Sequence, residues 1–239
     1  MARIALIGYG KMGKTIEKIA LSRGNTISMI IDQDNIEDIN KIAKENTDSI
    51  IEFTMPESAV NNLKNCFKSK VPVVCGTTGW LENWSEVVSE CQNQDAGFFY
   101  ASNYSVGVNI FFKLNEWLAK AMNGFDQYNV LMEEIHHIHK KDEPSGTAIT
   151  LAEGILENLN RKTNWKLYFE ETESDIAITS KRIGEVPGTH STVFRSAVDE
   201  IEIKHTAHSR EGFALGAVLA AEYMVGKKGV LGMNEMLKF

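Results

Sequence analysis

The sequence has few cysteines and few prolines. Among its 239 residues are 3 cysteines and 4 prolines. The cysteines are odd in number and show no CxxC spacing, so they predict neither a disulfide framework nor a thiolate zinc site (Cys66, Cys75 and Cys91). Because a chain without a disulfide framework suits a reducing compartment, we expect a cytoplasmic protein.

Long apolar runs are also lacking. A helix that crosses a bilayer needs about 20 consecutive apolar residues, and no run in the sequence approaches that length. The apolar start at residues 4–7 is interrupted at once by Gly8, Gly10 and Lys11, which makes it too short for a signal peptide. The sequence therefore predicts no association with a membrane.

Positive charge is scarce as well. Lysine and arginine together number 25, against 32 aspartate and glutamate residues, and the formal net charge is -7. Because a negative field repels nucleic-acid phosphates, nucleic-acid binding is not predicted, and any site for a small anion must be local. With 43% hydrophobic and 24% charged residues, the chain has the composition of a folded globular protein.

Short β-rich runs alternate with helical stretches in the first hundred residues. Such alternation is typical of βαβ units on a parallel sheet. The predicted strands are residues 3–7, 25–31, 49–53, 71–75 and 97–101, and the predicted helices are 11–22, 36–45, one that begins at Pro56, and 82–94. We therefore predict an α/β domain over residues 1–104, with a Rossmann-type parallel sheet and helices on both faces.

The pattern changes after Tyr104. Helices are expected at 106–122 and 147–159, an extended run at 126–137, and antiparallel strands at 176–183, 191–196 and 200–205. This mixture predicts a second, α+β domain with an open mixed sheet over residues 105–209. An apolar helix at 211–225 is expected to pack back on the first sheet, so that residues 210–239 complete the first domain.

A glycine-rich loop follows the first predicted strand and opens a helix. It has the GxGxxG pattern and consists of Gly8, Tyr9, Gly10, Lys11, Met12 and Gly13. In a dinucleotide fold the first glycine permits a tight turn, the second lets the backbone approach a pyrophosphate, and the third lets the helix pack close to the strand. The helix N-terminus adds N–H donors and a positive dipole end. A glycine-rich turn without a ligand is the alternative.

Asp32 supports the dinucleotide interpretation. It lies about 20 residues past Gly13, at the end of the second predicted strand, where such folds place the carboxylate that binds the adenosine ribose. Gln33 and Asp34 follow, with no arginine or lysine beside them. Because a 2′-phosphate would meet carboxylates and no cation, we expect NADH to be used better than NADPH. A solvated loop acid is the alternative for Asp32.

Two more loops follow predicted strands of the first sheet. Ligands of open α/β sheets bind at the carboxyl ends of strands, where these loops lie. Small residues, hydroxyls and exposed backbone suit a nicotinamide ring and its ribose. The residues concerned are Gly76, Thr77 and Thr78 in one loop, and Ala101, Ser102, Asn103 and Tyr104 in the other. Each segment could also be a loop without a ligand.

Three of the six histidines gather in the middle of the chain. His136, His137 and His139 precede Lys140 at the end of a predicted strand. Adjacent strand residues face opposite sides, so one of the first two can reach a reacting centre while the other contacts a distal group. No metal is predicted, because His137 and His139 have no evident third ligand and Lys140 would repel a cation. A surface histidine cluster is the alternative.

A second helix N-terminus lies just beyond the histidines. Ser145, Gly146 and Thr147 open a predicted helix and offer N–H groups and two hydroxyls. Together with His137 and Lys140, this turn predicts a receptor for a carboxylate in an otherwise acidic protein. A capping turn without a ligand is the alternative.

These segments together resemble the dihydrodipicolinate reductase family, whose members are also called 4-hydroxy-tetrahydrodipicolinate reductases. The resemblance runs from Ile4 to near the C-terminus. It rests on GYGKMG at 8–13, GTTG at 76–79, ASNYSVGVN at 101–109, EEIHHIHKKDEPSGTA at 133–148 and VPGTH at 186–190. The His-His-x-His-Lys segment followed by Asp-x-Pro-Ser-Gly-Thr is highly specific to that family.

The resemblance implies an activity and a role for each segment. Such an enzyme reduces 4-hydroxy-tetrahydrodipicolinate to tetrahydrodipicolinate with NADH or NADPH, in the pathway to diaminopimelate and lysine. Residues 105–209 would bind the cyclic dicarboxylate, close over the cofactor and join a homotetramer. The three loops and Asp32 would bind the cofactor. The implied catalytic residues are His136, as proton donor, and Lys140, and the implied substrate-binding residues are His137, Ser145, Gly146 and Thr147.

Two other functional classes stay open as interpretations of the sequence. Another Rossmann-type amino-acid dehydrogenase would share the first domain and differ at the histidine and lysine segment. A regulatory protein that senses NADH would need the glycine loop and Asp32, but it would have no use for that segment. The chain is also shorter than the longer family members after Asp32 and around residues 160–192, and these are the regions of the adenine contacts and the oligomer interface.

Overall fold

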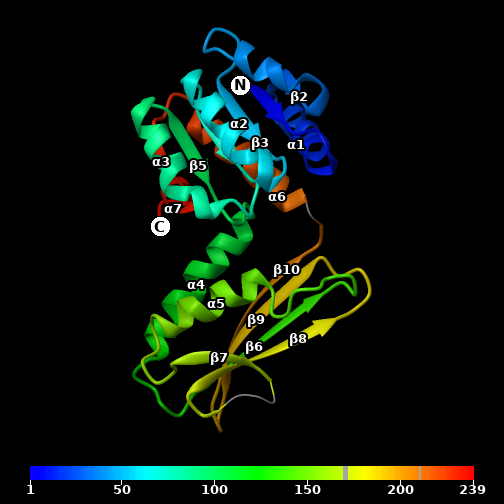
Figure 1. The fold of residues 1–239 in the computed structure, drawn as a ribbon. Coiled ribbons are helices and arrows are strands. Elements are labelled where there is room, and N and C mark those ends of the chain that lie inside the picture. Colours follow the sequence, from blue (N-terminus) through cyan, green and yellow to red (C-terminus); the bar gives the residue numbers. More distant parts are fainter. Residues whose placement is uncertain (169–171, 210) are drawn as a thin grey trace. The chain divides into compact units, whose positions relative to one another are not determined.

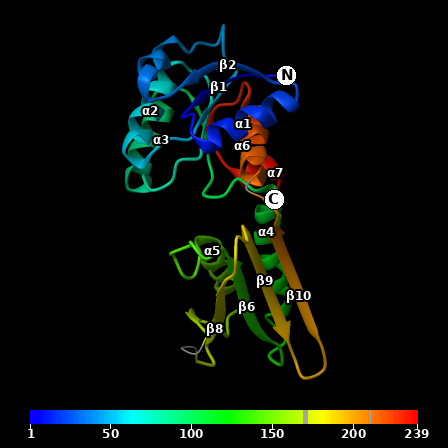
Figure 2. The ribbon, with the colours of Figure 1, turned by 90° about the vertical axis from the view of Figure 1, so that its right-hand side faces the viewer.

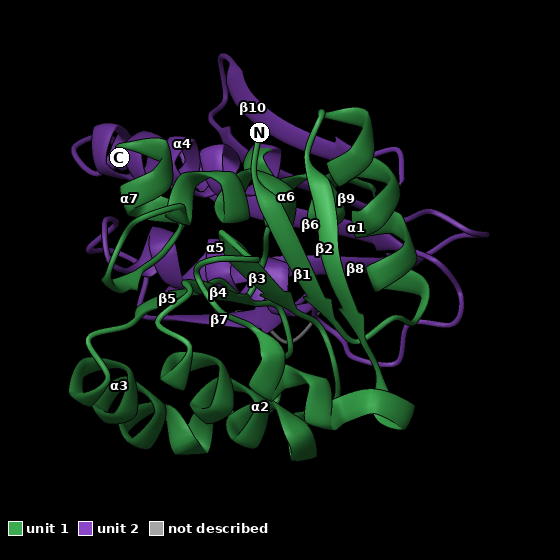
Figure 3. Cartoon of the chain, turned by 90° about the horizontal axis from the view of Figure 1, so that it is seen from above, with its two compact units in different colours: residues 1–106, 211–239 green, residues 107–210 purple. Residues whose placement is uncertain are grey.

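The computed structural model describes residues 1–168, 172–209 and 211–239. The chain divides into two compact units, one of residues 1–106 with 211–239 and one of residues 107–210, which Figure 3 shows in different colours. The roles predicted for these parts of the chain stay predictions. Among the described helices, none combines the length and the apolar character that crossing a bilayer requires.

The first unit is built on a six-stranded sheet. Its strands pair in parallel throughout. Because helices cover both faces, the central strands are buried on both sides and are mostly apolar, with Ser49 and Glu52 as the polar ends of β3. In sheet order they are β11 (Gly229–Leu231), β5 (Gly97–Tyr100), β4 (Val73–Cys75), β3 (Ser49–Glu52), β1 (Arg3–Ile7) and β2 (Thr26–Ile31).

Two separate layers of helices cover the faces of this sheet. One face packs against α2 (Pro56–Lys68), α3 (Trp84–Asn93) and the 3₁₀ segment η1 (Gln33–Lys41). The other packs against α1 (Lys11–Ser22) and α6 (Glu211–Met224). Figures 1 and 2 show the two layers. The predicted Rossmann-type sheet with helices on both faces is confirmed.

Helix α6 explains why the C-terminal segment is rich in alanine and glycine. It contacts β3, β4 and α1, as the prediction for residues 211–225 requires. A Cβ atom at Gly216 would lie 1.7 Å from the carbonyl oxygen of Tyr104, so the helix backbone lies directly on the preceding chain. The short elements η2 (Leu81–Asn83), β11 and α7 (Met233–Leu237) were not predicted, because their runs of three to five residues carry little periodicity.

The predicted helix at 36–45 is wrong. The structure has the 3₁₀ segment η1 over Gln33–Lys41 instead, with a non-helical residue at Asn35. The segment starts early because the Asp32 side chain accepts a hydrogen bond from the Gln33 N–H at 2.9 Å and caps it. Within η1 only Ile39 is buried, so there is too little apolar contact to hold a longer α-helix.

The second unit has a five-stranded mixed sheet with helices α4 (Val106–Met122) and α5 (Gly146–Leu156) against one face. The buried residues of β6 alternate along the strand, and Val130 and Met132 pack in the helix-covered core. The next two buried positions of that strand are Glu134 and His136. In sheet order the strands are β10 (Glu200–Ala207), β9 (Gly188–Arg195), β6 (Asn129–His136), β8 (Asp175–Arg182) and β7 (Asn164–Leu167).

One predicted strand direction is wrong. Residues 176–183 were expected in an antiparallel arrangement, but β8 pairs in parallel with both β6 and β7. The connection from β6 to β8 contains α5, and a helical crossover returns the chain in the same direction. β9 is antiparallel to β6 and to β10 as expected, so the sheet is mixed. The short strand β7 was not predicted.

Candidate functional site

The three glycines of the GxGxxG loop lie in different surroundings. Gly8 has φ +90°, and a Cβ there would lie 2.0 Å from the carbonyl oxygen of Phe53. A Cβ at Gly13 would lie 2.3 Å from the carbonyl oxygen of Gly8. At Gly10 a Cβ would meet no atom within 4 Å. The fold therefore requires glycine at the first and third positions, whereas at the second the loop leaves open space at the N-terminus of α1.

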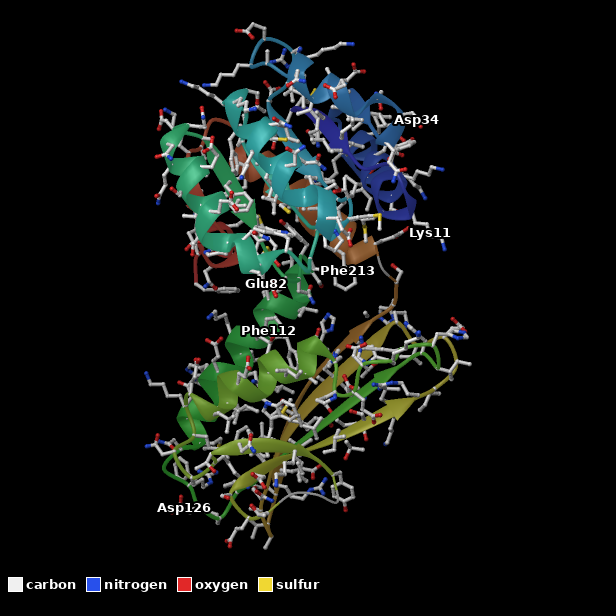
Figure 4. The ribbon with its side chains drawn as sticks, in the orientation of Figure 1. Lys11, Asp34, Glu82, Phe112, Asp126 and Phe213 are labelled. Atoms are coloured by element: carbon white, nitrogen blue, oxygen red, sulfur yellow. The ribbon has the colours of Figure 1, made fainter. Side chains whose placement is uncertain are left out.

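A cavity of about 540 Å³ lies beside this loop. Gly8, Gly10 and Asp32 line it, at the carboxyl ends of β1 and β2. The carboxylates of Asp32 and Glu57 belong to the lining, and no lysine or arginine among the described residues does. Lys11 and Asp34 are exposed at the start of α1 and in η1, respectively (Figure 4). The cavity has the place and the glycine backbone that a dinucleotide needs, and the charged side chains that line it are carboxylates.

Asp32 is held at the rim of this cavity. Its carboxylate accepts the Gln33 N–H, while its own N–H donates to Asn35 Oδ1 at 2.8 Å. The side chain remains exposed, so one oxygen can cap η1 while the other stays available for a ribose hydroxyl.

The first two residues of the GTTG loop after β4 are needed by the fold itself. A Cβ at Gly76 would lie 1.8 Å from the Phe53 ring. The Thr77 hydroxyl is buried and donates to Glu52 Oε2 at 2.8 Å. Thr78 and Gly79 are exposed. The Thr77 hydroxyl thus bonds within the protein, and the predicted cofactor role of this residue stays a prediction.

The loop after β5 also combines structural and exposed residues. Tyr104 is buried and its hydroxyl donates to the Cys75 carbonyl at 2.7 Å. Burial raises the pKa of Tyr104 well above its usual value, so the phenol stays neutral. Its predicted cofactor role stays a prediction. Ser102 is exposed and Ala101 and Asn103 are half-buried, and these residues can meet a ligand.

Glu52 is a buried acid that the sequence reasoning missed. It stands at the end of β3 with no exposed surface. It accepts hydrogen bonds from the hydroxyls of Thr54 and Thr77 and from Cys75 Sγ. The carboxylate thereby ties the ends of β3 and β4 together beneath the predicted cofactor loops. A glutamate directly after the two isoleucines of β3 was the available signal.

In the second unit, β6 brings the histidine pair to its end. His136 is buried and its ring lies 5.0 Å from that of His190, at an interplanar angle of 71°. His137 is half-buried and its ring lies 6.1 Å from that of His139. The two adjacent imidazoles therefore have different neighbours, as the alternation of a strand requires.

Lys140 lies in the loop between β6 and α5. Its Nζ lies 2.9 Å from Asp142 Oδ2, and its N–H donates to the His137 carbonyl at 3.2 Å. The contact with Lys140 lowers the pKa of Asp142. The lysine is thus held as a partly exposed cation close to His137 along the chain.

The first turn of α5 follows this loop. The Ser145 side chain accepts the Ala148 N–H at 3.2 Å and so caps the helix. Ser145 is 2% exposed, and its predicted substrate-binding role stays a prediction. Gly146 is exposed and Thr147 is half-buried. Because the first N–H groups of a helix have no intrahelical partners, these two residues can donate to an anion.

A buried polar cluster lies behind these residues and was not predicted. It contains Glu134, His136 and His190, whose nearest nitrogen and oxygen atoms lie within 4.8 Å of one another. The Glu134 carboxylate accepts the Ser145 N–H at 3.1 Å and contacts Arg182 at 3.3 Å. Because these donors already engage the carboxylate, the cluster fits a network of hydrogen bonds and ion pairs better than a metal site.

Two of the three buried titratable groups of this cluster, Glu134 and His190, have shifted pKa values. Burial disfavours ionisation of Glu134, but polar contacts from His136, Ser145 and Ser180 outweigh it and hold the pKa of Glu134 well below its usual range. Burial, together with the nearby His136, lowers the pKa of His190 to about 4. At neutral pH the cluster therefore holds a carboxylate beside a neutral His190.

Two family models match the chain. The one described as "Dihydrodipicolinate reductase, N-terminus" matches residues 2–104, and "Dihydrodipicolinate reductase, C-terminus" matches residues 107–237. The 4-hydroxy-tetrahydrodipicolinate reductase of Christiangramia forsetii is 49% identical over 236 residues, which cover 98% of this chain and 97% of the relative. The protein of the same name from Methanococcus aeolicus is 36% identical, with 96% and 82% covered.

Solved structures share the fold at lower identity. The dipicolinate-bound dihydrodipicolinate reductase of Paenisporosarcina sp. TG-14 has a TM-score of 0.77 and 21% identity, and the match covers 98% of each chain. An amine dehydrogenase from Mycobacterium smegmatis has a TM-score of 0.63 and 10% identity, with 98% and 95% covered. At these identities the likeness concerns the fold alone.

Proposed function

Because the chain belongs to the dihydrodipicolinate reductase family, we propose that it reduces 4-hydroxy-tetrahydrodipicolinate to tetrahydrodipicolinate with a nicotinamide cofactor. The reaction is a step toward diaminopimelate and lysine. The observation that carries the proposal is that both halves of the family match in order and over nearly the whole chain. The chain is thus an oxidoreductase, and the following assignments refine that statement.

The first unit is the part of the chain to which we assign the cofactor. The open space at Gly10, the N-terminus of α1 and the exposed Asp32 suit a pyrophosphate and a ribose. Thr78, Ala101, Ser102 and Asn103 are assigned to the nicotinamide half, with the backbone of Gly76 and Thr77. When bound, NADH or NADPH supplies the hydride that the substrate takes up at C4.

NADH is the proposed preferred cofactor. A 2′-phosphate carries negative charge, and the cavity beside Asp32 is lined by two carboxylates and, among the described residues, by no lysine or arginine. Bringing like charges together at the rim costs binding free energy. The preference rests on this charge arrangement.

The substrate is a dianionic ring, which the second unit is proposed to bind. The N–H groups of Gly146 and Thr147 would receive one carboxylate at the N-terminus of α5, and His137 would contact the substrate beside them. The open space around Gly146, where a Cβ would meet nothing within 4 Å, supports this assignment. Ser145, which caps the helix, is assigned to the same carboxylate.

His136 and Lys140 are the proposed catalytic residues. Loss of the 4-hydroxyl group as water leaves a conjugated imine, and its reduction at C4 leaves an enamine whose C3 must be protonated. We assign that proton to His136, because imidazole is the side chain whose ordinary pKa lies nearest neutral pH. Lys140 would stabilise the negative charge that develops or help to deliver the proton. No metal takes part in this scheme.

We also propose that the enzyme is a cytoplasmic homotetramer. The cysteines are free and buried, as suits a reducing compartment. In the described part of the second unit, β10 lies at the edge of the sheet and pairs on one side only, and Ile201 on it is 41% exposed. Such an edge is a site at which another copy can pair.

A coupled assay tests the reaction. A synthase generates 4-hydroxy-tetrahydrodipicolinate in place, and oxidation of NADH is followed at its absorbance band. We expect turnover with this substrate and none with oxaloacetate or 2-oxo acids. Turnover with a 2-oxo acid and ammonia, and none with the synthase product, would identify an amino-acid dehydrogenase. NADH binding without turnover of any of these would favour a sensor.

A further inference from the structure

Glu134 has no role in the assignments above, although it is the acid nearest to the proposed proton donor. It lies on β6 two residues before His136, and both side chains are on the buried face of that strand. Glu134 has no exposed surface. Burying a carboxylate away from water costs free energy unless the group is paired, so the partners of Glu134 indicate what it does.

The carboxylate has partners on two sides. The Ser145 N–H donates to it at 3.2 and 3.1 Å, and both terminal nitrogens of Arg182 lie 3.3 Å from Oε1. On the other side, Oε2 lies 3.3 Å from His136 Nδ1 and 3.7 Å from His190 Nε2. Glu134 thus connects the start of α5, β8 and β9 with the imidazole at the end of its own strand.

The orientation of the His136 ring distinguishes its two nitrogens. Nδ1 is buried and has no well-aligned hydrogen bond among the described residues, and Glu134 Oε2, 3.3 Å away, is the carboxylate oxygen in ion-pair contact with it. Nε2 lies at Gly188, where a Cβ atom would come within 3.1 Å of it. The glycine therefore leaves room at Nε2, while the carboxylate occupies the side of Nδ1.

We propose that Glu134 is a positioning residue that keeps a proton on Nδ1 of His136 and thereby leaves Nε2 as the nitrogen that gives its proton to the substrate. The inference rests on the proposed function of His136 as proton donor. A carboxylate behind an imidazole selects the tautomer and stabilises the imidazolium form, as in the triads of hydrolases. The His190 ring packs edge-to-face against the His136 ring, with 5.0 Å between their centroids, and limits its rotation.

Other charged groups act on the same pair. Arg182 contacts the carboxylate from β8, His190 lies opposite from β9, and Lys140 and Asp142 form an ion pair in the loop between β6 and α5. At neutral pH His190 is neutral, because its pKa is about 4. Among the described residues, Glu134 is the buried carboxylate in direct contact with His136.

The experiment compares Glu134→Gln with Glu133→Gln. Gln keeps the volume of the side chain and removes its charge. Glu133 is the adjacent residue, half-buried and ion-paired with Lys181 from the next strand, so it controls for loss of a carboxylate on β6. Histidine ¹⁵N resonances are recorded at alkaline pH, where imidazole side chains are neutral, with the His136→Gln spectrum used to assign them. In the wild type and in Glu133→Gln, we expect the neutral His136 ring to carry its proton on Nδ1.

In Glu134→Gln we expect a mixture of tautomers. We also expect kcat to fall on the order of 10–100-fold, the loss typical when the partner of a functional imidazole is removed. The Kd for NADH should stay unchanged. A neutral wild-type His136 with its proton on Nε2 overturns the proposal, and this measurement needs no variant to fold. An unchanged tautomer in folded Glu134→Gln, or an altered tautomer with kcat unchanged, overturns it as well.

The spectra do not depend on the identity of the substrate. If the wild type does not turn over the dicarboxylate, the proposed function fails, while the tautomers still decide whether Glu134 controls the ring of His136.

Discussion

The hydroxyl of Ser145 lies 3.2 Å from Nε2 of His190, although 45 positions of sequence separate the two residues. The same hydroxyl caps α5, and the N–H of Ser145 donates to Glu134. One serine therefore joins the start of α5 to β6 and β9. The proposed carboxylate receptor at Gly146 and Thr147 is held in place by these three contacts.

Replacement of Ser145 by alanine is expected to destabilise the protein and to weaken substrate binding. Loss of the cap costs about 0.5–2 kcal/mol, and the change leaves His190 without its hydrogen-bond partner. Urea unfolding measures the first effect, and KM for the dicarboxylate, which should rise, measures the second. Ser145→Thr, which keeps a capping hydroxyl, should recover most of both. Unchanged stability in the alanine variant would contradict the role of the cap.

Two substitutions in the GxGxxG loop should separate an effect on ligand binding from an effect on folding. Gly10→Ala meets no protein atom within 4 Å, so it should leave the melting temperature unchanged and raise the Kd for NADH at least tenfold. Gly13→Ala places its Cβ against the Gly8 carbonyl, so it should lower the melting temperature. Calorimetry and fluorescence titration provide the two measurements. If Gly10→Ala bound NADH normally, the assignment of the pyrophosphate to this loop would be wrong.

The proposed catalytic pair should affect kcat without affecting the cofactor. His136→Gln and Lys140→Ala are each expected to lower kcat by about 10²–10⁴-fold, because both remove groups that act on the reacting ring. The Kd for NADH should stay the same. Lys141→Ala is the matched control, because Lys141 is the adjacent, exposed lysine and has no assigned role. Normal turnover in either of the first two variants would remove its assignment.

A cation beside Asp32 should change the choice of cofactor. Gln33 lines the cavity next to the proposed ribose carboxylate. Gln33→Arg would supply a bidentate partner for a 2′-phosphate and should raise kcat/KM for NADPH relative to NADH. Gln33→Leu controls for removal of the amide. A wild type that already prefers NADPH would contradict the charge argument.

His190 should make folding stability depend on pH. Its pKa is about 4 in the folded protein and 6.5 in its ordinary state, so between these values the unfolded chain binds more protons. Stability from this group is present above pH 6.5 and falls as the pH drops toward 4, by on the order of 3 kcal/mol. Urea unfolding at pH 7, 5.5 and 4.5 measures the slope. His190→Gln should flatten the slope, and the exposed His208→Gln should not.

Sequence patterns predicted the features that depend on local periodicity and on a motif. The βαβ alternation identified the parallel sheet, and the apolar 211–225 segment identified α6 and the layer that it joins. The parallel direction of β8 was missed, because alternation along a strand is the same in both directions.

The candidate site could be predicted only in part from the sequence. A motif identifies the residues that chemistry needs, but not which of their atoms the fold uses. Ser145, Thr77 and Tyr104 belong to predicted segments, yet their hydroxyls bond within the protein. Conversely, Glu134 and His190 were not predicted, because their pairing across β6 and β9 joins residues far apart in the sequence.

Helix α6 and β11 come from the last 29 residues of the chain, yet they complete the unit that the first 106 residues begin. On a ribosome, the N-terminal sheet would emerge with its α1 face still lacking α6, whereas residues 107–210 can be complete earlier. Domains generally fold as units during synthesis, usually from the N-terminus. Here the order is reversed, because the first unit to begin is the last to close, and a nascent chain stopped before residue 211 would expose the apolar surface that α6 covers.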